Sequence, residues 1–73
     1  MSYYIISLFL ENEGEKDFRE LPVCKKDAGV LEYFSLKRLL KKVLNATKVD
    51  IVAAKPIEEH EFTLFSEEEA VYI

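Results

Sequence analysis

Glycine, cysteine and histidine are scarce in this sequence of 73 residues, which contains two glycines, one cysteine and one histidine. Gly14 and Gly29 stand far apart, which excludes a glycine-rich phosphate loop and the dinucleotide-binding fingerprint. The single cysteine, Cys24, excludes an intrachain disulfide and a cysteine metal cluster, and it favours a reducing compartment. Several common kinds of catalytic and cofactor site are therefore excluded.

The lone histidine and the lone cysteine also lack the partners that chemistry would need. His60 lies between two glutamates, and a His–carboxylate pair supplies two ligands where a catalytic zinc needs three. Cys24 precedes two lysines, which would lower a thiol pKa, but only His60 could act as its base. We expect an exposed histidine and a half-buried cysteine that packs as a small hydrophobe. The prediction is a non-enzymatic protein with no catalytic residue, no cofactor and no metal.

Long apolar runs are missing as well. The run Tyr3–Leu10 has eight residues interrupted by Ser7, which is too short to span a bilayer and lacks the flanks of a signal peptide. We therefore expect a cytoplasmic protein. With 49% hydrophobic residues, the chain can form a compact core, and its length predicts a single compact α+β domain over residues 1–73. A domain of this size is marginally stable, so a subunit interface could contribute to its stability.

A helix from about Ser35 to Asn45 is the clearest predicted element. Its apolar side chains recur at positions i, i+3, i+4, i+7 and i+8, as expected for a helix with one buried face. These residues are Leu36, Leu39, Leu40, Val43 and Leu44. The Ser35 hydroxyl is the predicted N-cap. Basic side chains occupy the opposite arc, namely Lys37, Arg38, Lys41 and Lys42.

The first half of the chain predicts a β-hairpin. Tyr3–Leu10 is apolar on both alternating faces, which favours a strand buried on both sides near the centre of the sheet. The polar stretch Glu11–Lys16 reads as the hairpin loop, with Gly14 supplying a positive φ. Phe18–Val23 is the second strand, and Pro22 assigns it to a sheet edge because proline cannot donate to the ladder.

The remaining elements are short. Val30–Phe34 is predicted as a strand, with an early turn of helix as the alternative. Val49–Ala54 is predicted as a strand that pairs inside the sheet and ends before Pro56. His60–Phe65 alternates apolar and polar residues and is predicted as a strand with one wet face.

The C-terminal residues leave two alternatives. Ala70–Ile73 is predicted as a last strand after a turn over Ser66–Glu69, or Ser66 and Glu69 form a capping box for a final helical turn. Val71–Ile73 is expected to complete the chain's own sheet rather than add to the edge of a partner's sheet. The predicted fold is α+β, with one amphipathic helix packed on a four- or five-stranded, mainly antiparallel sheet.

Charge is strongly segregated along the chain, which has a net charge of −4. Residues 25–48 carry seven basic side chains against two acidic ones, whereas residues 56–73 carry six acidic side chains and no basic one. The interaction candidates are therefore the four basic helix residues and the acidic residues Glu58, Glu59, Glu61, Glu67, Glu68 and Glu69. Such asymmetry steers charged partners.

These patterns favour a small acidic module that binds another protein. An inhibitor or regulator of a nucleic-acid-handling protein, of the small acidic kind that some viruses make, fits the charge pattern. A second interpretation is nucleic-acid binding through the basic helix face. A third is a structural subunit of a homo-oligomer, which predicts an exposed apolar patch on the helix-free face of the sheet.

Overall fold

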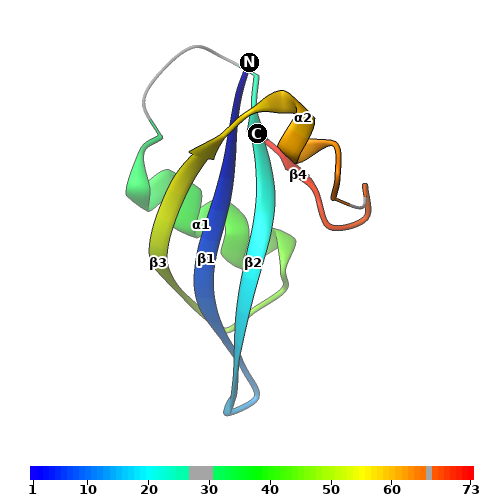
Figure 1. The fold of residues 1–73 in the computed structure, drawn as a ribbon. Helices are drawn as coiled ribbons and strands as arrows, with labels where there is room; N and C mark the ends of the chain where they lie inside the picture. The colour runs from blue at the N-terminus through cyan, green and yellow to red at the C-terminus, as the bar shows by residue number, and fades with distance from the viewer. Residues whose placement is uncertain (27–30, 66) are drawn as a thin grey trace.

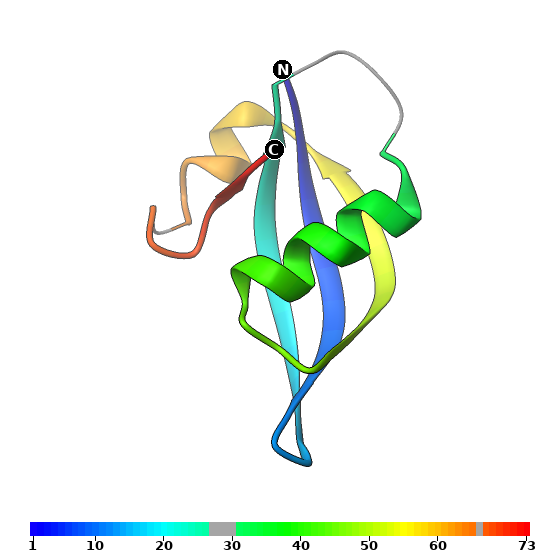
Figure 2. The ribbon, with the colours of Figure 1, turned by 180° about the vertical axis from the view of Figure 1, so that it is seen from behind.

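A computed structural model describes residues 1–26, 31–65 and 67–73. The described elements are β1 (Ser2–Asn12), β2 (Glu15–Lys25), α1 (Tyr33–Val43), β3 (Lys48–Ile57), α2 (Glu59–Phe62) and β4 (Val71–Tyr72). The strands form one sheet in the order β3-β1-β2-β4. Figure 1 shows α1 behind this sheet, and Figure 2, turned by 180°, shows α1 in front of it. The short helix α2 lies at one end of the opposite face.

The fold belongs to the α+β class, with a mixed sheet of four strands. β1 pairs antiparallel with both β2 and β3, whereas β4 pairs parallel to β2. The parallel pair is only two residues long, from Val23 opposite Val71 to Cys24 opposite Tyr72. The sheet is therefore not plainly antiparallel, and the described residues form a second helix that the sequence pattern did not predict.

The predicted hairpin is confirmed, with β1 at the centre of the sheet. Its two-residue turn consists of Glu13 and Gly14, which have φ values of 53° and 82°. A two-residue hairpin loop needs positive φ at both positions because its twist must match that of the strands. Burial on both faces of β1 was a wrong prediction. Ile6 and Leu8 face α1 and are fully buried, whereas Phe9 on the opposite face is 47% exposed.

β2 extends further than predicted, and the prediction that it forms a sheet edge is wrong, because it lies between β1 and β4. It carries Pro22 in its interior. Pro22 lies opposite Ile5 of β1, and β4 reaches only the two residues that follow it. Within the described residues, Pro22 therefore has a strand partner on one side alone, as its missing N–H requires.

β3 differs from its prediction in place and in length. It was expected inside the sheet, but among the described residues it pairs only with β1 and forms an edge. Pro56 does not stop it, since the strand continues to Ile57 and Pro56 lies opposite Tyr4. An edge strand tolerates proline because one side of its backbone lacks a ladder. A register shift where Ser7 is followed by Leu8 leaves one extra residue on β3.

Helix α1 begins two residues before its predicted start. Its N-cap is Glu32, whose carboxylate accepts hydrogen bonds from the backbone N–H groups of Phe34 (3.1 Å) and Ser35 (2.7 Å). The predicted cap, Ser35, thus lies inside the helix. The predicted strand Val30–Phe34 is also wrong where it is described, because Tyr33 and Phe34 are helical and Leu31 and Glu32 belong to no strand. Its first residue lies outside the described residues.

The C-terminal end of α1 is closed by Asn45, which has a φ of 51°. The N–H of Ala46 donates to the carbonyl of Lys41, and the N–H of Asn45 donates to that of Lys42. This hydrogen-bond pair is the Schellman arrangement, in which a left-handed residue satisfies the last helical carbonyls. The helix therefore ends at Val43, two residues before the predicted limit.

The leucine stripe of α1 packs on the sheet as predicted, with one exception. Leu36 and Leu40 are buried, Leu39 and Leu44 are partly buried, and Val43 is 53% exposed. Val43 is the last residue of the helix. The main core joins α1 to one sheet face and comprises Ile6, Leu8, Leu10, Leu21, Val23, Leu36, Leu40, Ala46, Val49 and Val71.

Residues 60–65 do not form the predicted strand. Residues Glu59–Phe62 are the helix α2, in which the N–H of Phe62 donates to the Glu58 carbonyl. The Glu58 N–H donates to the Glu61 carboxylate at 3.1 Å, which favours helix at this point. The last strand is confirmed as β4, and Ile73 donates to the carbonyl of Cys24. The capping box predicted for Ser66 lies partly outside the described residues.

Replacing Glu32 by glutamine should lower the melting temperature by a few degrees at neutral pH. Hydrogen bonds from the Ser35 hydroxyl, and then from the N–H groups of Ser35 and Phe34, hold the pKa of Glu32 below its ordinary value. The carboxylate therefore stabilises the fold above its unfolded-state pKa, and this contribution is lost as the pH falls through the folded-state pKa.

Thermal unfolding followed by circular dichroism, from neutral pH to about pH 2, measures this effect. The wild type and the Glu32→Gln variant should converge in acid, because both then carry an uncharged side chain. A constant difference across the whole range would show that the carboxylate charge does not matter.

Candidate protein-binding surface

The acidic residues near the C-terminus lie on one short stretch of backbone that is anchored to the sheet. We call residues 58–65 and 67–69 the acidic segment. Its anchor is Phe62, which is 7% exposed and packs against Tyr3 (ring centroids 4.9 Å apart) and Tyr72 (5.9 Å). Tyr3 and Tyr72 lie on β1 and β4, so a second, smaller aromatic cluster forms on the face opposite α1. This cluster fixes α2 in place.

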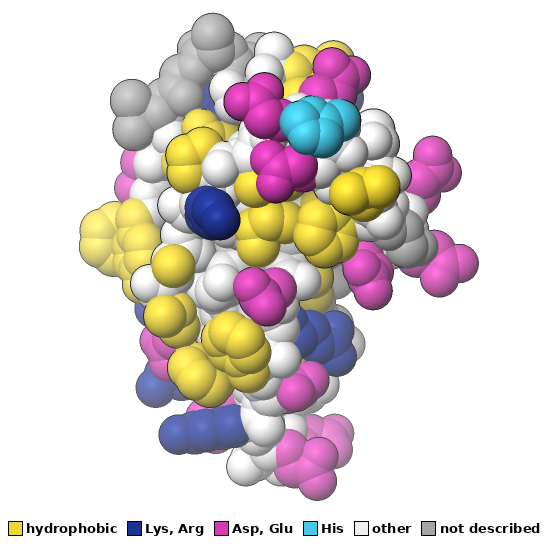
Figure 3. Space-filling view, viewed as in Figure 1, with side chains coloured by type: hydrophobic (Ala, Val, Ile, Leu, Met, Phe, Trp, Pro, Cys, Tyr) yellow, Lys and Arg dark blue, Asp and Glu magenta, His cyan; other side chains and the backbone are white. Residues whose placement is uncertain are grey.

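All six predicted acidic candidates are solvent-exposed in this segment. Glu59 and Glu61 lie on α2, Glu58 is its N-cap, and the other three occupy the turn before β4. Figure 3 shows acidic side chains around the histidine over α2 and along the side of the molecule near the C-terminal turn. The structure thus exposes the glutamates of both α2 and the turn before β4.

The acidic segment also contains an exposed leucine. Leu64 is 84% exposed; it lies between Glu61 and Glu67 in the sequence, two residues after the buried anchor. Its neighbour Phe65 is 37% exposed. A large, exposed apolar side chain with charged neighbours in the sequence can serve as the apolar centre of an interface that has a polar rim. Sequence reasoning missed Leu64, because a strand would have directed it into the core.

The carboxylates also act on the aromatic cluster below them. Partial burial, and then the negative charge of Glu59, raise the pKa of the Tyr3 hydroxyl. Tyr3 therefore stays neutral over the physiological range. Its hydroxyl donates to the Met1 sulfur at 3.6 Å.

The basic candidates lie on the other side of the sheet. Arg38, Lys41 and Lys42 are exposed on α1, and Lys37 is partly buried with its ammonium 3.8 Å from Asp50 of β3. No ion pair between described residues joins α1 to the acidic segment. Figures 1 and 2 show why, since the sheet separates α1 from α2. The sheet therefore separates the basic residues of α1 from the glutamates of α2, whereas Glu68 and Glu69 line a hollow together with Val43 at the end of α1.

The lone histidine and the lone cysteine lie in environments of different exposure. His60 is exposed, as predicted, but on α2 rather than on a strand. Cys24 is a free thiol only 2% exposed, so it is more deeply buried than predicted. Among the described residues, no group of three or more His, Cys, Asp or Glu could hold a metal ion. Within the same residues, no helix is long and apolar enough to cross a membrane.

A second surface, which we call the outer sheet face, consists of the sheet side chains that point away from α1. Phe9 of β1 and Phe18 of β2 lie opposite each other on it, with ring centroids 5.1 Å apart, and are 47% and 49% exposed. Val52 of β3 is 58% exposed. Apolar side chains lie along the middle and lower part of this face in Figure 3. The homo-oligomer interpretation predicts an apolar patch on a helix-free face, whereas this face carries α2 at one end.

The residues of this patch could have been found from the sequence. Once the hairpin turn is placed at Glu13 and Gly14, strand register makes Phe9 face Phe18. The missing information was which face of the sheet the helix covers.

The chain was compared with known protein families, proteins and structures. No family model, no curated protein and no solved structure matches this chain. Its function must therefore be inferred from its own residues.

Proposed function

We propose that this chain is a non-enzymatic, acidic protein-binding module that acts through the acidic segment. The observation that carries the proposal is Leu64, an 84% exposed apolar side chain that lies between Glu61 and Glu67 in the sequence, close to the anchor Phe62. An apolar anchor with a charged rim provides both affinity and orientation, because the anchor desolvates and the charges steer the encounter.

The charge of this surface defines the class of partner. Residues 56–73 carry six carboxylates and no cation, so a matching surface must be basic and must hold an apolar pocket for Leu64. Proteins that handle nucleic acids have such basic surfaces, since they bind phosphates. We therefore propose an inhibitor or regulator of a nucleic-acid-handling protein, acting in the cytoplasm, where Cys24 would stay reduced.

Paired affinity capture from host cells tests this function. The bait is the wild-type chain, and the test variant combines Glu59→Gln, Glu67→Gln and Glu69→Gln. Glu58 and Glu61 are kept because their hydrogen bond closes the start of α2. The control variant combines Arg38→Gln, Lys41→Gln and Lys42→Gln, which changes equally many exposed charges on the opposite side.

We expect mass spectrometry to identify a protein that wild type and control enrich and the test variant loses, with enrichment falling as salt rises. If a partner is lost only with the control variant, the binding surface is the basic face of α1 instead of the acidic segment. If that partner were nucleic acid, the second interpretation would replace ours. If no protein is enriched by the wild type, the proposal fails.

A further inference from the structure

On the outer sheet face, strand β2 carries a charge pattern that is complementary to itself. On β2, Lys16, Phe18 and Glu20 occupy alternate positions, so their side chains share this face. Lys16 therefore lies two residues before Phe18 on this face, and Glu20 lies two residues after it. When two such strands stack face to face and antiparallel, each Lys16 lies over the partner's Glu20.

We propose that the outer sheet face binds a second copy of this chain and forms a two-fold symmetric dimer. The axis lies in the interface and crosses the strands at the level of Phe9 and Phe18. β2 then stacks on the partner's β2, as in packed sheets whose strands are nearly aligned. A two-fold interface uses the same patch on both subunits, which is why self-complementarity is required.

The aromatic pair supplies the apolar centre of this interface. Phe9 and Phe18 remain about half exposed in one chain although they already contact each other. Covering them with a second pair buries apolar surface at roughly 25 cal/mol per Å². A chain of this length buries only about 60% of its unfolded surface, so a shared interface adds stability that its own core lacks.

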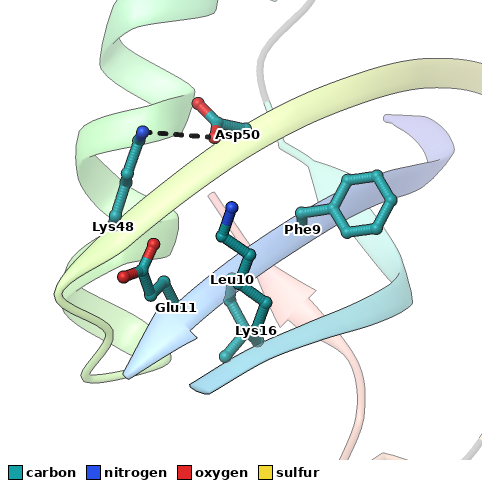
Figure 4. A pocket seen from close by; sticks show the side chains of 6 residues that line it. All are labelled: Phe9, Leu10, Glu11, Lys16, Lys48 and Asp50. Carbon is teal, nitrogen blue, oxygen red and sulfur yellow. Dashed lines mark ion pairs between the residues drawn. The ribbon is translucent and has the colours of Figure 1, made fainter. Parts of the chain in front are cut away.

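Two hollows flank the aromatic pair and receive the charged ends. Towards the hairpin, Lys16 lines a hollow with Phe9, Leu10, Glu11, Lys48 and Asp50, and Figure 4 shows its long side chain there. Towards α2, Glu20 lines a second hollow with Glu61, Lys55 and Phe65. The two-fold axis places the hairpin end of one copy at the α2 end of the other. The Lys16 ammonium then approaches a hollow that is lined by two carboxylates, those of Glu20 and Glu61, and by one ammonium, that of Lys55.

Charge reversal at the two ends of this pattern tests the dimer by sedimentation or light scattering over a range of concentrations. The wild-type mass should rise from the 8.5 kDa of one chain towards twice that value. Lys16→Glu alone, or Glu20→Lys alone, should weaken the dimer roughly tenfold or more, because symmetry places two like-charge contacts in each variant. Combining both reversals in one chain should restore the wild-type affinity.

Mixing the two single variants supplies a second readout. Each repels itself, but their charges are opposite, so the mixture should form a mixed dimer. Both positions are exposed, so the variants should fold, and circular dichroism checks that they do. A wild type that stays monomeric at every concentration overturns the proposal, as does a dimer that neither single reversal weakens. Neither variant alters the glutamates or Leu64 proposed to bind the partner, so this test can fail without affecting the proposed function.

Discussion

Replacing Leu40 by alanine should destabilise the protein by about 2–5 kcal/mol, and part of the population should be unfolded at room temperature. Leu40 is fully buried in the middle of α1 and packs into the core between the helix and the sheet. The loss combines the transfer free energy of the side chain with the cost of the cavity. A small single core rarely supplies more than about 3–5 kcal/mol, so this one change removes most of the stability.

Urea unfolding followed by circular dichroism measures the effect. Val43→Ala on the same helix is the matched control, because Val43 is 53% exposed and its truncation should cost less than about 0.5 kcal/mol. Equal unfolding midpoints for the two variants would contradict the assignment of the core to the Leu36 and Leu40 side of α1.

Replacing Phe62 by alanine should release the acidic segment from the sheet while the main core remains folded. Removal of a buried phenylalanine typically costs about 3–5 kcal/mol. Here the lost contacts are those to Tyr3 and Tyr72, which lie on the face opposite α1. The destabilisation is therefore local, and α2 should open at a free energy below that of global unfolding.

Amide hydrogen exchange separates the two regions. In wild type, the N–H of Thr63 donates to the Glu59 carbonyl, and the N–H of Leu44 donates to that of Leu40. In the Phe62→Ala variant, protection should fall at Thr63 and persist at Leu44. Leu64→Ala is the control, since its exposed side chain contributes little to stability. Equal loss of protection at both sites would mean that α2 and the main core unfold as one unit.

The hairpin and the helix could be predicted from the sequence because each depends on local signals. Gly14 marks a turn whose φ values suit few other residues, and the leucine spacing identifies the buried side of α1. Because these signals are local, they did not place the start of the helix correctly. A glutamate can cap a helix when its longer side chain folds back to the N–H groups, and Glu32 does so two residues before the serine that looked like the cap.

The acidic segment was identified by its charge but not by its conformation. The alternation of Phe62 and Leu64 with polar residues predicts a strand, yet the same residues form α2 because the Glu58–Glu61 hydrogen bond closes a helical turn and Phe62 finds a pocket between two tyrosines. That pocket consists of residues from β1 and β4, which are distant in sequence. No local pattern contains this information, and so the exposure of Leu64 was not foreseen.

The binding affinity of the captured partner for the Leu64→Ala variant tests the central claim most directly. Titration calorimetry compares the wild type with this variant. Because the two proteins should have the same free energy of unfolding, the difference in affinity isolates the contribution of the exposed leucine. We predict at least a tenfold weaker affinity for the variant, as expected for a hot-spot side chain, and a further loss when Glu59, Glu67 and Glu69 are changed to glutamine. Wild-type affinity in both variants would show that the acidic segment does not bind the partner.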